Sequence, residues 1–429
     1  MLTVIIQPST VKGGVRIPPS KSVTQRALAL ALTHDGTSIL HGAGHSKDEQ
    51  QVAGIIEALG ASIRRVDDQT IEIRGVDKIK PEVCLDCGES ALAARMFTCI
   101  AALASEKILI KGKGSLMKRP MDGLIKMLEP RVKYLHSDNG KLPIEICGPL
   151  KISEEVIDGA SSSQHLTGLL IALAISVSVE TQIEVRELVG KPYVDLTLSL
   201  LDSFGCRVEH EDYRRFTIYP RSVLKAPVRL QIEADWSNAA FWVVAGAMGE
   251  PLLLKGLSLE SKQGDKVILD VARAAGVSIV SGAEGLIVSK SGVLKPFEFD
   301  ASNYPDLFPP LSVLAAFIEG VSVIKGVTRL HTKESDRALS ILEMLKQLGV
   351  SAEVKSDDML IYGGRLRGGS VDSFGDHRIA MAASIAALGA EGAVTVGRAE
   401  AVEKSYPTFF SHLAELGVSL SLNIQNQDQ

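Results

Sequence analysis

The chain has few cysteines, no strong charge excess and no long apolar run, and each shortage excludes a class of protein. Five cysteines occur among 429 residues, which favours a reducing compartment such as the cytoplasm over a disulfide-stabilised secreted domain. The net charge of −5 lacks the basic excess of a nucleic-acid-binding protein. The longest uncharged run, residues 159–179, is too weakly apolar for a membrane span and is interpreted as a buried helix. We therefore expect a cytoplasmic protein with no nucleic-acid or membrane partner.

A Cys-x-x-Cys motif, Cys84 to Cys87, is the pattern most typical of metal or redox chemistry in this chain. No second pair of Cys or His residues follows at the spacing of a zinc site. We expect neither a metal nor a cofactor, and we interpret both cysteines as small residues at the end of a strand.

A recurring unit of helix, glycine and short strand indicates an internal repeat. Its glycines are residues 60, 205, 276, 349 and 417, at intervals of 145, 71, 73 and 68. The first interval is twice the others, so a sixth unit is expected near residue 132. Units of this length fit β-α-β-α-β-β modules, and the glycine suits the left-handed cap that ends a helix. The pattern predicts an α/β fold of six such repeats, in two domains.

Each repeat also has a second helix with a polar start and an alanine- and leucine-rich body. The six segments begin SKSVTQR, ESALAAR, SSSQHLT, DWSNAAF, DLFPPLS and DHRIAMA. Apolar bodies indicate buried helices, and the free N–H groups of a helix start favour anions. Six such starts facing one place would bind a highly anionic ligand.

Charged residues at several of these starts are candidates for the binding site. Lys21, Ser22 and Arg26 could grip a phosphate or carboxylate, although Ser22 could equally be a helix cap and the two bases solvated. Arg337 works against the dipole of its helix, and Arg378 enters a helix too apolar to be exposed. Both would be stabilised by an anion, or by a structural carboxylate.

Two carboxylates lie among these bases. Asp306 could be a turn residue and Glu334 a helix cap, but a carboxylate in a basic cleft is costly unless it transfers a proton or binds a hydroxyl. We regard both as candidate acid/base groups. Arg119 and Lys404, each near a proline, are more typical of a surface when considered singly.

Nine motifs follow one another along nearly the whole chain: PPSKSVTQRALALA, DCGESALAAR, MKRPMDGL, SSSQHLTGLL, KPYVDLTL, YPDLFPPLSVLAA, KESDRALSILEMLKQLG, GDHRIAMA and KSYPTFF. Together they resemble the enolpyruvyl transferases, and most of all the EPSP synthase family. The resemblance implies the two-domain enolpyruvyl transferase fold, an inside-out α/β barrel. It places one domain at residues 14–228, on the shikimate 3-phosphate side. The other comprises residues 1–13 and 229–429, on the phosphoenolpyruvate (PEP) and acid/base side, with the active site in the interdomain cleft.

The resemblance also implies a reaction, namely transfer of the enolpyruvyl group of PEP to the 5-hydroxyl of shikimate 3-phosphate with release of phosphate, by a monomer. The residues implied for shikimate 3-phosphate are Lys21, Ser22, Arg26, Ser162, Ser163, Gln164, Tyr193, Asp306 and Lys333. Those implied for PEP are Lys21, Ala91, Arg119, Gln164, Arg337, Arg378 and Lys404. Those implied for catalysis are Asp306, Glu334, Lys21, Lys404 and His377.

Several positions depart from the family's usual pattern. GESAL replaces GN(A/S)GT, so that Glu89 stands for asparagine, Ala91 for glycine and Leu92 for threonine. Glu89 is expected to point away from a bound anion, to pair with a base such as Arg95, or to be protonated. Ala91 is expected to crowd the bulkier PEP-site inhibitor glyphosate more than PEP itself.

Two more departures concern phosphate binding. Gly190 stands where a phosphate-binding serine is common, and Arg329 stands where an asparagine often binds substrate. Arg329 could supply the phosphate ligand that a glycine at 190 cannot.

Two alternatives remain. One is a UDP-N-acetylglucosamine enolpyruvyl transferase, but the cysteine usual in that family before the matched arginine is missing from KGKGSLMKRP, and PSKS is absent from that family. The other is a non-catalytic relative that binds phosphorylated ligands. The changes at 89, 91 and 92 motivate it, and the retained Asp306, Glu334 and basic residues argue against it.

Overall fold

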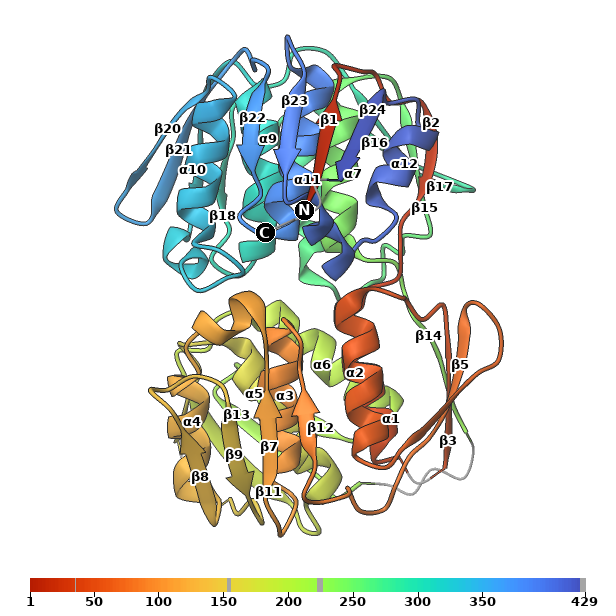
Figure 1. The fold of residues 1–429 in the computed structure, drawn as a ribbon, viewed down its shortest axis with the longest axis vertical. Helices are drawn as coiled ribbons and strands as arrows, with labels where there is room; N and C mark the ends of the chain where they lie inside the picture. Colours follow the sequence, from red (N-terminus) through yellow and green to blue (C-terminus); the bar gives the residue numbers. More distant parts are fainter. Residues whose placement is uncertain (35, 153–155, 222–226, 425–429) are drawn as a thin grey trace. The chain divides into compact units, whose positions relative to one another are not determined.

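The computed structural model describes residues 1–34, 36–152, 156–221 and 227–424. The chain forms two compact units: unit 1 comprises Met1–Pro18 and Ala234–Gln429, and unit 2 comprises Pro19–Glu233 (Figure 1). Sequence analysis expected the boundaries after residues 13 and 228. Strand pairing accounts for the later positions. Strand β2 (Gly13–Arg16) joins β15 (Leu252–Lys255) of unit 1, and β14 (Val228–Gln231) joins β3 (Thr37–His41) of unit 2. Each strand therefore completes a sheet of the unit that the chain is about to leave.

Unit 2 contains three four-stranded sheets with the same strand pattern over its described residues. In spatial order they are β14, β3, β5 (Thr70–Arg74) and β4 (Ser62–Arg65); β6 (Cys84–Asp86), β7 (Ile108–Lys111), β9 (Ile144–Cys147) and β8 (Tyr134–Ser137); and β10 (Val156–Asp158), β11 (Thr181–Arg186), β13 (Arg215–Ile218) and β12 (Val208–Glu211). The first two strands of each sheet are parallel and the other neighbours antiparallel.

Unit 1 repeats this pattern in its own three sheets. They are β2, β15, β17 (Gly285–Lys290) and β16 (Val277–Gly282); β18 (Glu298–Asp300), β19 (Gly320–Lys325), β21 (Asp358–Gly363) and β20 (Ser351–Lys355); and β22 (Gly369–Asp372), β23 (Val394–Gly397), β1 (Leu2–Ile6) and β24 (Leu420–Ile424). The described residues thus form the six predicted repeats, and the one expected near residue 132 is the β6–β9 repeat.

Every repeat contributes two helices. The helices that end before a hairpin are α2 (Lys47–Ala58), α4 (Asp122–Leu128), α6 (Lys191–Ser203), α8 (Ile268–Ala274), α10 (Arg337–Gln347) and α12 (Phe409–Glu415). A repeat glycine follows each of these helices except α4. All five glycines have positive φ, between 70° and 110°, as the predicted caps require.

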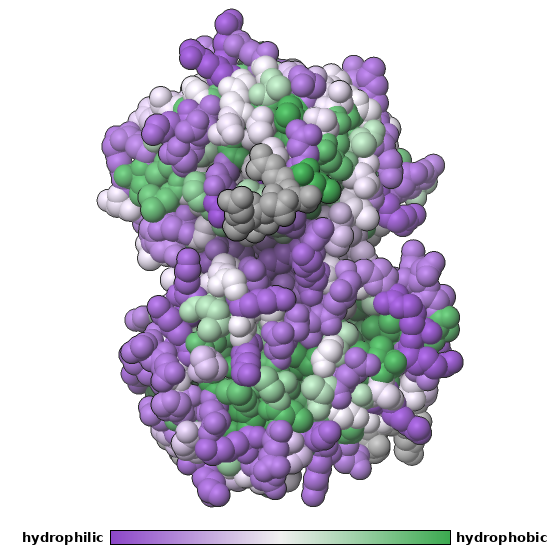
Figure 2. All heavy atoms as spheres, in the orientation of Figure 1, coloured by the Kyte–Doolittle hydropathy of each residue, from purple (hydrophilic) through white to green (hydrophobic). Residues whose placement is uncertain are grey.

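The other helix of each repeat has the polar start. These are α1 (Lys21–Leu32), α3 (Ala91–Ala101), α5 (Ser163–Ser176), α7 (Trp236–Met248), α9 (Phe308–Phe317) and α11 (His377–Ala386). Their bodies are buried almost completely, as predicted, and they form the core of their unit with the sheets packed outside (Figure 1). Hydrophilic residues cover much of the visible face of each unit (Figure 2). No helix in the described ranges is long and apolar enough to span a membrane.

Candidate active site

Arg337, the first residue of α10, lies at the centre of a buried cluster of charges in unit 1. Its Nη1 donates to Asp306 Oδ1 over 2.8 Å, and its Nη2 donates to Glu334 Oε2 over 2.7 Å. Its Nε donates to Asp376 Oδ2 over 2.9 Å. Burial opposes the charged form, but the three carboxylates outweigh burial and raise the pKa of Arg337 above its ordinary value. The arginine is therefore charged, and its direction is set by three separate segments.

Two further bases predicted for the site join this cluster. Arg378 Nη2 donates to Asp306 Oδ2 over 2.9 Å, and Lys404 Nζ lies 3.6 Å from Glu334 Oε1. Both side chains are over nine-tenths buried. Five residues expected from the motifs, Asp306, Glu334, Arg337, Arg378 and Lys404, are thus brought together within unit 1.

The electrostatics of Asp306 suit a group that stays ionised. Burial favours its neutral form, but Arg378, Arg337 and then Lys333 outweigh burial and hold the pKa of Asp306 well below its ordinary value. Lys333, expected as a substrate ligand, therefore also stabilises the ionised form of Asp306. At neutral pH Asp306 can accept a hydrogen bond but has no proton to give.

A second buried carboxylate behaves in the opposite way. Asp265 is 1% exposed and accepts a hydrogen bond from Ser237 Oγ, at the start of α7. Burial first, and then the negative charge of Asp306, raise the pKa of Asp265 to about 6. Arg378 acts in the other direction but does not offset them. Unit 1 therefore contains neighbouring carboxylates whose environments separate their pKa values.

The start of α11 carries Asp376, His377 and Arg378. Asp376 is the N-cap, since its Oδ1 accepts the backbone N–H of Arg378 over 2.9 Å. The same side chain binds Arg337, so a single aspartate connects the starts of two helices. His377 is 1% exposed, and its Nδ1 lies 3.9 Å from Asp376 Oδ1. His377 is therefore adjacent to the carboxylate that orients Arg337.

In unit 2 the start of α1 is tied to two neighbouring helices. Lys21 Nζ lies 3.0 Å from Asp48 Oδ2, near the start of α2. Gln25 Nε2 donates to the Asp48 carbonyl and to Ser90 Oγ, the N-cap of α3. The expected PEP-side residue Ala91 follows that cap and is 5% exposed. Three helix starts of unit 2 therefore share one hydrogen-bond network.

Arg26 has a structural partner as well as its predicted ligand role. Its Nε donates to Thr197 Oγ1 over 2.9 Å, and its Nη1 donates to the carbonyl of Ser22 over 2.9 Å. Thr197 in turn donates to the carbonyl of Tyr193 over 2.9 Å. Burial lowers the pKa of Arg26 to about 10, so the side chain is still charged at neutral pH. Ser22, Arg26 and Tyr193 are thus linked.

The start of α5 holds the three residues expected there. Ser162 is the N-cap and accepts from the backbone N–H of Gln164 over 3.2 Å, while Ser163 is buried. Gln164 Oε1 accepts from Arg95 Nη1 over 2.6 Å, and Arg95 Nη2 donates to the carbonyl of Pro120. Arg95 therefore connects Gln164 with Pro120, the residue that follows Arg119. Arg119 itself is 6% exposed.

Two of the departures have a structural explanation. Gly190 has φ +67°, and a Cβ there would lie 2.8 Å from Ser163 Oγ, so a serine would have to displace Ser163. Glu89 Oε2 accepts from Ser115 Oγ over 3.0 Å, so its carboxylate lies against the segment that leads to Arg119. A phosphate-binding role for Arg329 stays a prediction.

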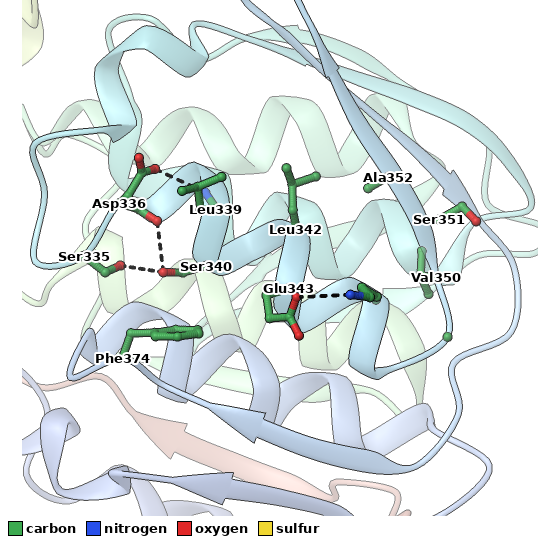
Figure 3. Close-up of a pocket in the computed structure, with 12 residues that line it drawn as sticks. Ser335, Asp336, Leu339, Ser340, Leu342, Glu343, Val350, Ser351, Ala352 and Phe374 are labelled. Carbon is green, nitrogen blue, oxygen red and sulfur yellow. Dashed lines mark hydrogen bonds and ion pairs between the residues drawn. The ribbon is translucent and has the colours of Figure 1, made fainter.

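A surface groove of about 830 Å³ runs beside α10 (Figure 3). At its polar end Ser340 Oγ donates to Ser335 Oγ over 2.9 Å, and Ser335 Oγ donates to Asp376 Oδ2 over 3.4 Å. The remaining lining includes Leu339, Leu342 and Phe374. Of the described residues that line this groove, none was expected in the site. The groove borders the Arg337 cluster but is separate from it.

The described residues include no group of three or more His, Cys, Asp or Glu side chains that could hold a metal ion. Cys84 is exposed at the start of β6, and burial raises the pKa of the Cys87 thiol above its ordinary value. A raised pKa disfavours the thiolate that metal binding and redox exchange both require.

Sequence reasoning missed several residues of the site. Asp48, Thr197 and Asp265 were not singled out, and Asp376 was not expected in the site. Their partners lie between 27 and 171 residues away in the chain. No local spacing signal could identify such pairs. The buried charge expected at Arg378 was the available hint, because such a charge needs a counterpart.

Comparison with known proteins identifies the family of the chain. The family model for EPSP synthase (3-phosphoshikimate 1-carboxyvinyltransferase) matches residues 5–413. A 3-phosphoshikimate 1-carboxyvinyltransferase of Clostridium acetobutylicum is 36% identical over 427 residues, covering 97% of this chain and 98% of that protein. One from Thermococcus kodakarensis is 37% identical over 417 residues, covering 96% and 99%.

Solved structures show the same fold. The EPSP synthase of Acinetobacter baumannii has a TM-score of 0.82 at 25% identity, covering 99% of this chain and 100% of that chain. The enolpyruvyl transferase NikO of Streptomyces tendae has a TM-score of 0.76 at 17% identity, covering 98% and 99%, and supports the fold alone. The chain belongs to the EPSP synthase (3-phosphoshikimate 1-carboxyvinyltransferase) family.

Proposed function

We propose that this enzyme transfers the enolpyruvyl group of PEP to the 5-hydroxyl of shikimate 3-phosphate and releases phosphate. The observation that carries the proposal is the cluster of Asp306, Glu334, Arg337, Arg378 and Lys404 in a chain of this family. Two carboxylates and three buried bases supply both acid/base groups and anion ligands. These are the groups that a reaction between two phosphorylated carboxylates needs.

We assign the anionic substrates to the polar helix starts of both units. Shikimate 3-phosphate is assigned to Lys21, Ser22, Arg26, Ser162, Ser163, Gln164, Tyr193, Asp306 and Lys333. PEP is assigned to Lys21, Ala91, Arg119, Gln164, Arg337, Arg378 and Lys404. The support is that Arg26, Arg119, Arg337, Arg378 and Lys404 are buried bases, for which an anion is a natural partner. A supporting feature at Arg378 is that its Nη1 has no hydrogen-bond partner among the described residues.

The reaction needs proton transfer in both directions at C3 of PEP. The hydroxyl oxygen adds to C2 while C3 gains a proton, and the tetrahedral intermediate then loses a C3 proton and phosphate. We assign the C3 proton to Glu334, which gives it as a carboxylic acid in the addition step and takes it back in the elimination step as a carboxylate that Lys404 stabilises. Asp306 is assigned to the 5-hydroxyl, since an ionised carboxylate accepts that hydrogen bond. Lys21 and His377 are kept as assisting groups.

The direct test is phosphate release from PEP by the purified enzyme. We expect release with shikimate 3-phosphate and none with UDP-N-acetylglucosamine. Release with UDP-N-acetylglucosamine alone would contradict the proposed acceptor. Activity with neither acceptor, together with binding of shikimate 3-phosphate, would favour a non-catalytic relative.

We further propose that the enzyme acts as a monomer in the cytoplasm. The five cysteines are free thiols, four of them buried, which suits a reducing compartment. Light scattering of the purified protein tests the first part, and a mass near twice 45.9 kDa would contradict it.

A further inference from the structure

The segment between β7 and Arg119 is a short loop that ends in a 3₁₀ helix, Gly114–Lys118. Arg119 is the residue that closes this helix, since its backbone N–H donates to the carbonyl of Leu116 over 3.1 Å. The Arg119 side chain is buried. The position of Arg119 therefore depends on how this loop is held.

Two contacts attach the loop to the segment that precedes α3. The backbone N–H of Lys113 donates to the carbonyl of Gly88 over 2.8 Å. Ser115 Oγ donates to Glu89 Oε2 over 3.0 Å. The backbone of the loop also lies on the carboxylate, because a Cβ built on Gly114 would collide with Glu89 Oε1. Glu89 thus meets the loop through both of its carboxylate oxygens.

The other side of Glu89 is firmly anchored. The next residue, Ser90, is 1% exposed and caps α3 by accepting from the backbone N–H of Ala93. Ser90 Oγ also accepts from Gln25 Nε2 over 3.0 Å, which ties it to α1. Glu89 therefore connects the buried, hydrogen-bonded start of α3 with a loop in which only Leu116 of Gly114–Lys118 is buried.

We propose that Glu89 is a positioning residue, whose carboxylate holds the Gly114–Lys118 segment and thereby sets the place of Arg119. The inference rests on the proposed function, which assigns Arg119 to PEP. It gives a role to a residue that departs from the family's asparagine. A side chain one methylene longer reaches both Gly114 and Ser115, and an ionised acceptor makes a stronger hydrogen bond than a neutral one.

The test combines steady-state kinetics with amide hydrogen exchange on the full chain. For Glu89→Ala we expect a rise of about tenfold in KM for PEP, with kcat and the KM for shikimate 3-phosphate within about twofold. Exchange at residues 114–118 should rise in the free enzyme. Glu89→Gln, which keeps the length and one acceptor oxygen, should retain most of the wild-type behaviour. Glu106→Ala, an exposed glutamate before β7, is the matched control and should change nothing.

A double-mutant cycle separates positioning from general damage. Ser115→Ala should raise KM for PEP less than Glu89→Ala does, and the double variant should resemble Glu89→Ala alone. Gly114→Ala should raise KM for PEP in the wild-type background. The rise should be smaller beside Glu89→Ala, because the carboxylate that the added methyl group would meet is gone. Simple additivity in both cycles would overturn the proposal.

Two outcomes distinguish this proposal from the proposed function. If wild-type enzyme releases no phosphate from PEP with shikimate 3-phosphate, the proposed function fails, while hydrogen exchange still tests the attachment of the loop. If the enzyme is active but Glu89→Ala leaves loop exchange and KM for PEP unchanged, the positioning role is wrong. Equal rises in KM for both substrates would also contradict it.

Discussion

Arg337 and Asp376 form an ion pair in the core of unit 1, with Arg337 Nε donating to Asp376 Oδ2 over 2.9 Å. Their side chains are 1% and 0% exposed. The pair joins the starts of α10 and α11, which each carry bases assigned to PEP. A substrate-binding arginine that is oriented before the substrate arrives loses less freedom on binding. The pair therefore has a structural role, and under the proposed function it also orients a PEP ligand before PEP binds.

Removing the carboxylate of this pair should destabilise the protein. Asp376→Ala leaves a buried guanidinium without one of its three counter-charges and removes the cap of α11. We expect the free energy of unfolding to fall by about 3–5 kcal/mol, as when one partner of a buried ion pair is removed. Urea denaturation followed by circular dichroism measures this change.

The exposed pair between Lys255 and Glu284 is the comparison, since the Glu284 side chain is 70% exposed. Glu284→Gln should leave the urea midpoint unchanged because surface ion pairs contribute little. Equal losses of stability in the two variants would argue that burial of the Arg337 pair has no energetic consequence.

The stability of the enzyme should fall as pH rises through the titration of Asp265. The folded-state pKa of Asp265 is about 6, above the ordinary 3.8, so the folded state binds this proton more tightly than the unfolded state does. The resulting stabilisation is complete below the ordinary value and is lost as pH rises to about 6. The difference corresponds to about 3 kcal/mol.

Asp265→Asn removes this titration while keeping an acceptor for Ser237. Between about pH 4 and pH 6 the wild type should lose stability relative to the variant, by up to the amount above. Urea unfolding of both proteins at matched pH values gives the comparison. Parallel curves over this range would show that Asp265 titrates normally.

Glu334→Gln and Asp306→Asn should both slow catalysis. Glu334→Gln removes the group assigned to the C3 proton, so kcat should fall by about 10²-fold or more. The pKa of Asp306 lies well below its ordinary value, so this carboxylate is ionised throughout the neutral range. Asp306→Asn should therefore slow the reaction without removing a limb of the pH profile of kcat.

Steady-state rates of both variants across the neutral range test both expectations. Glu343→Gln, at a partly exposed glutamate on the same helix as Arg337, should leave the kcat profile unchanged. A limb of the kcat profile that disappears in Asp306→Asn would contradict the assignment of Asp306 as a carboxylate that stays ionised.

Ala91 should reduce sensitivity to glyphosate. Its side chain is buried at the first position of α3, and its methyl group should crowd a PEP-site ligand bulkier than PEP. Ala91→Gly should lower the inhibition constant for glyphosate while changing KM for PEP less. Ala94→Gly, three residues along the same helix, controls for the helix weakening that glycine causes. An unchanged inhibition constant would show that steric exclusion is wrong.

Much of the fold follows from local patterns. The repeat glycines, the apolar helix bodies and the short strands are signals within a few residues, and they predicted six repeats that the structure confirms. The unit boundaries follow less readily from local patterns. No local pattern shows that β2 belongs to a sheet of unit 1 and β14 to a sheet of unit 2. Their partner strands lie about 240 and 190 residues away in the sequence.

The sequence by itself determined which residues carry charge at the helix starts, and hence that the protein handles anions. The tertiary structure decided which charges neutralise one another. Of the three carboxylates that Arg337 meets, Glu334 lies three residues before it, but Asp306 and Asp376 lie 31 and 39 residues away in the chain. Asp306 and Asp265 are the same residue type, and only burial and the neighbouring charges separate their pKa values. Desolvation and Coulomb energies depend on distances in space, which local sequence patterns do not specify.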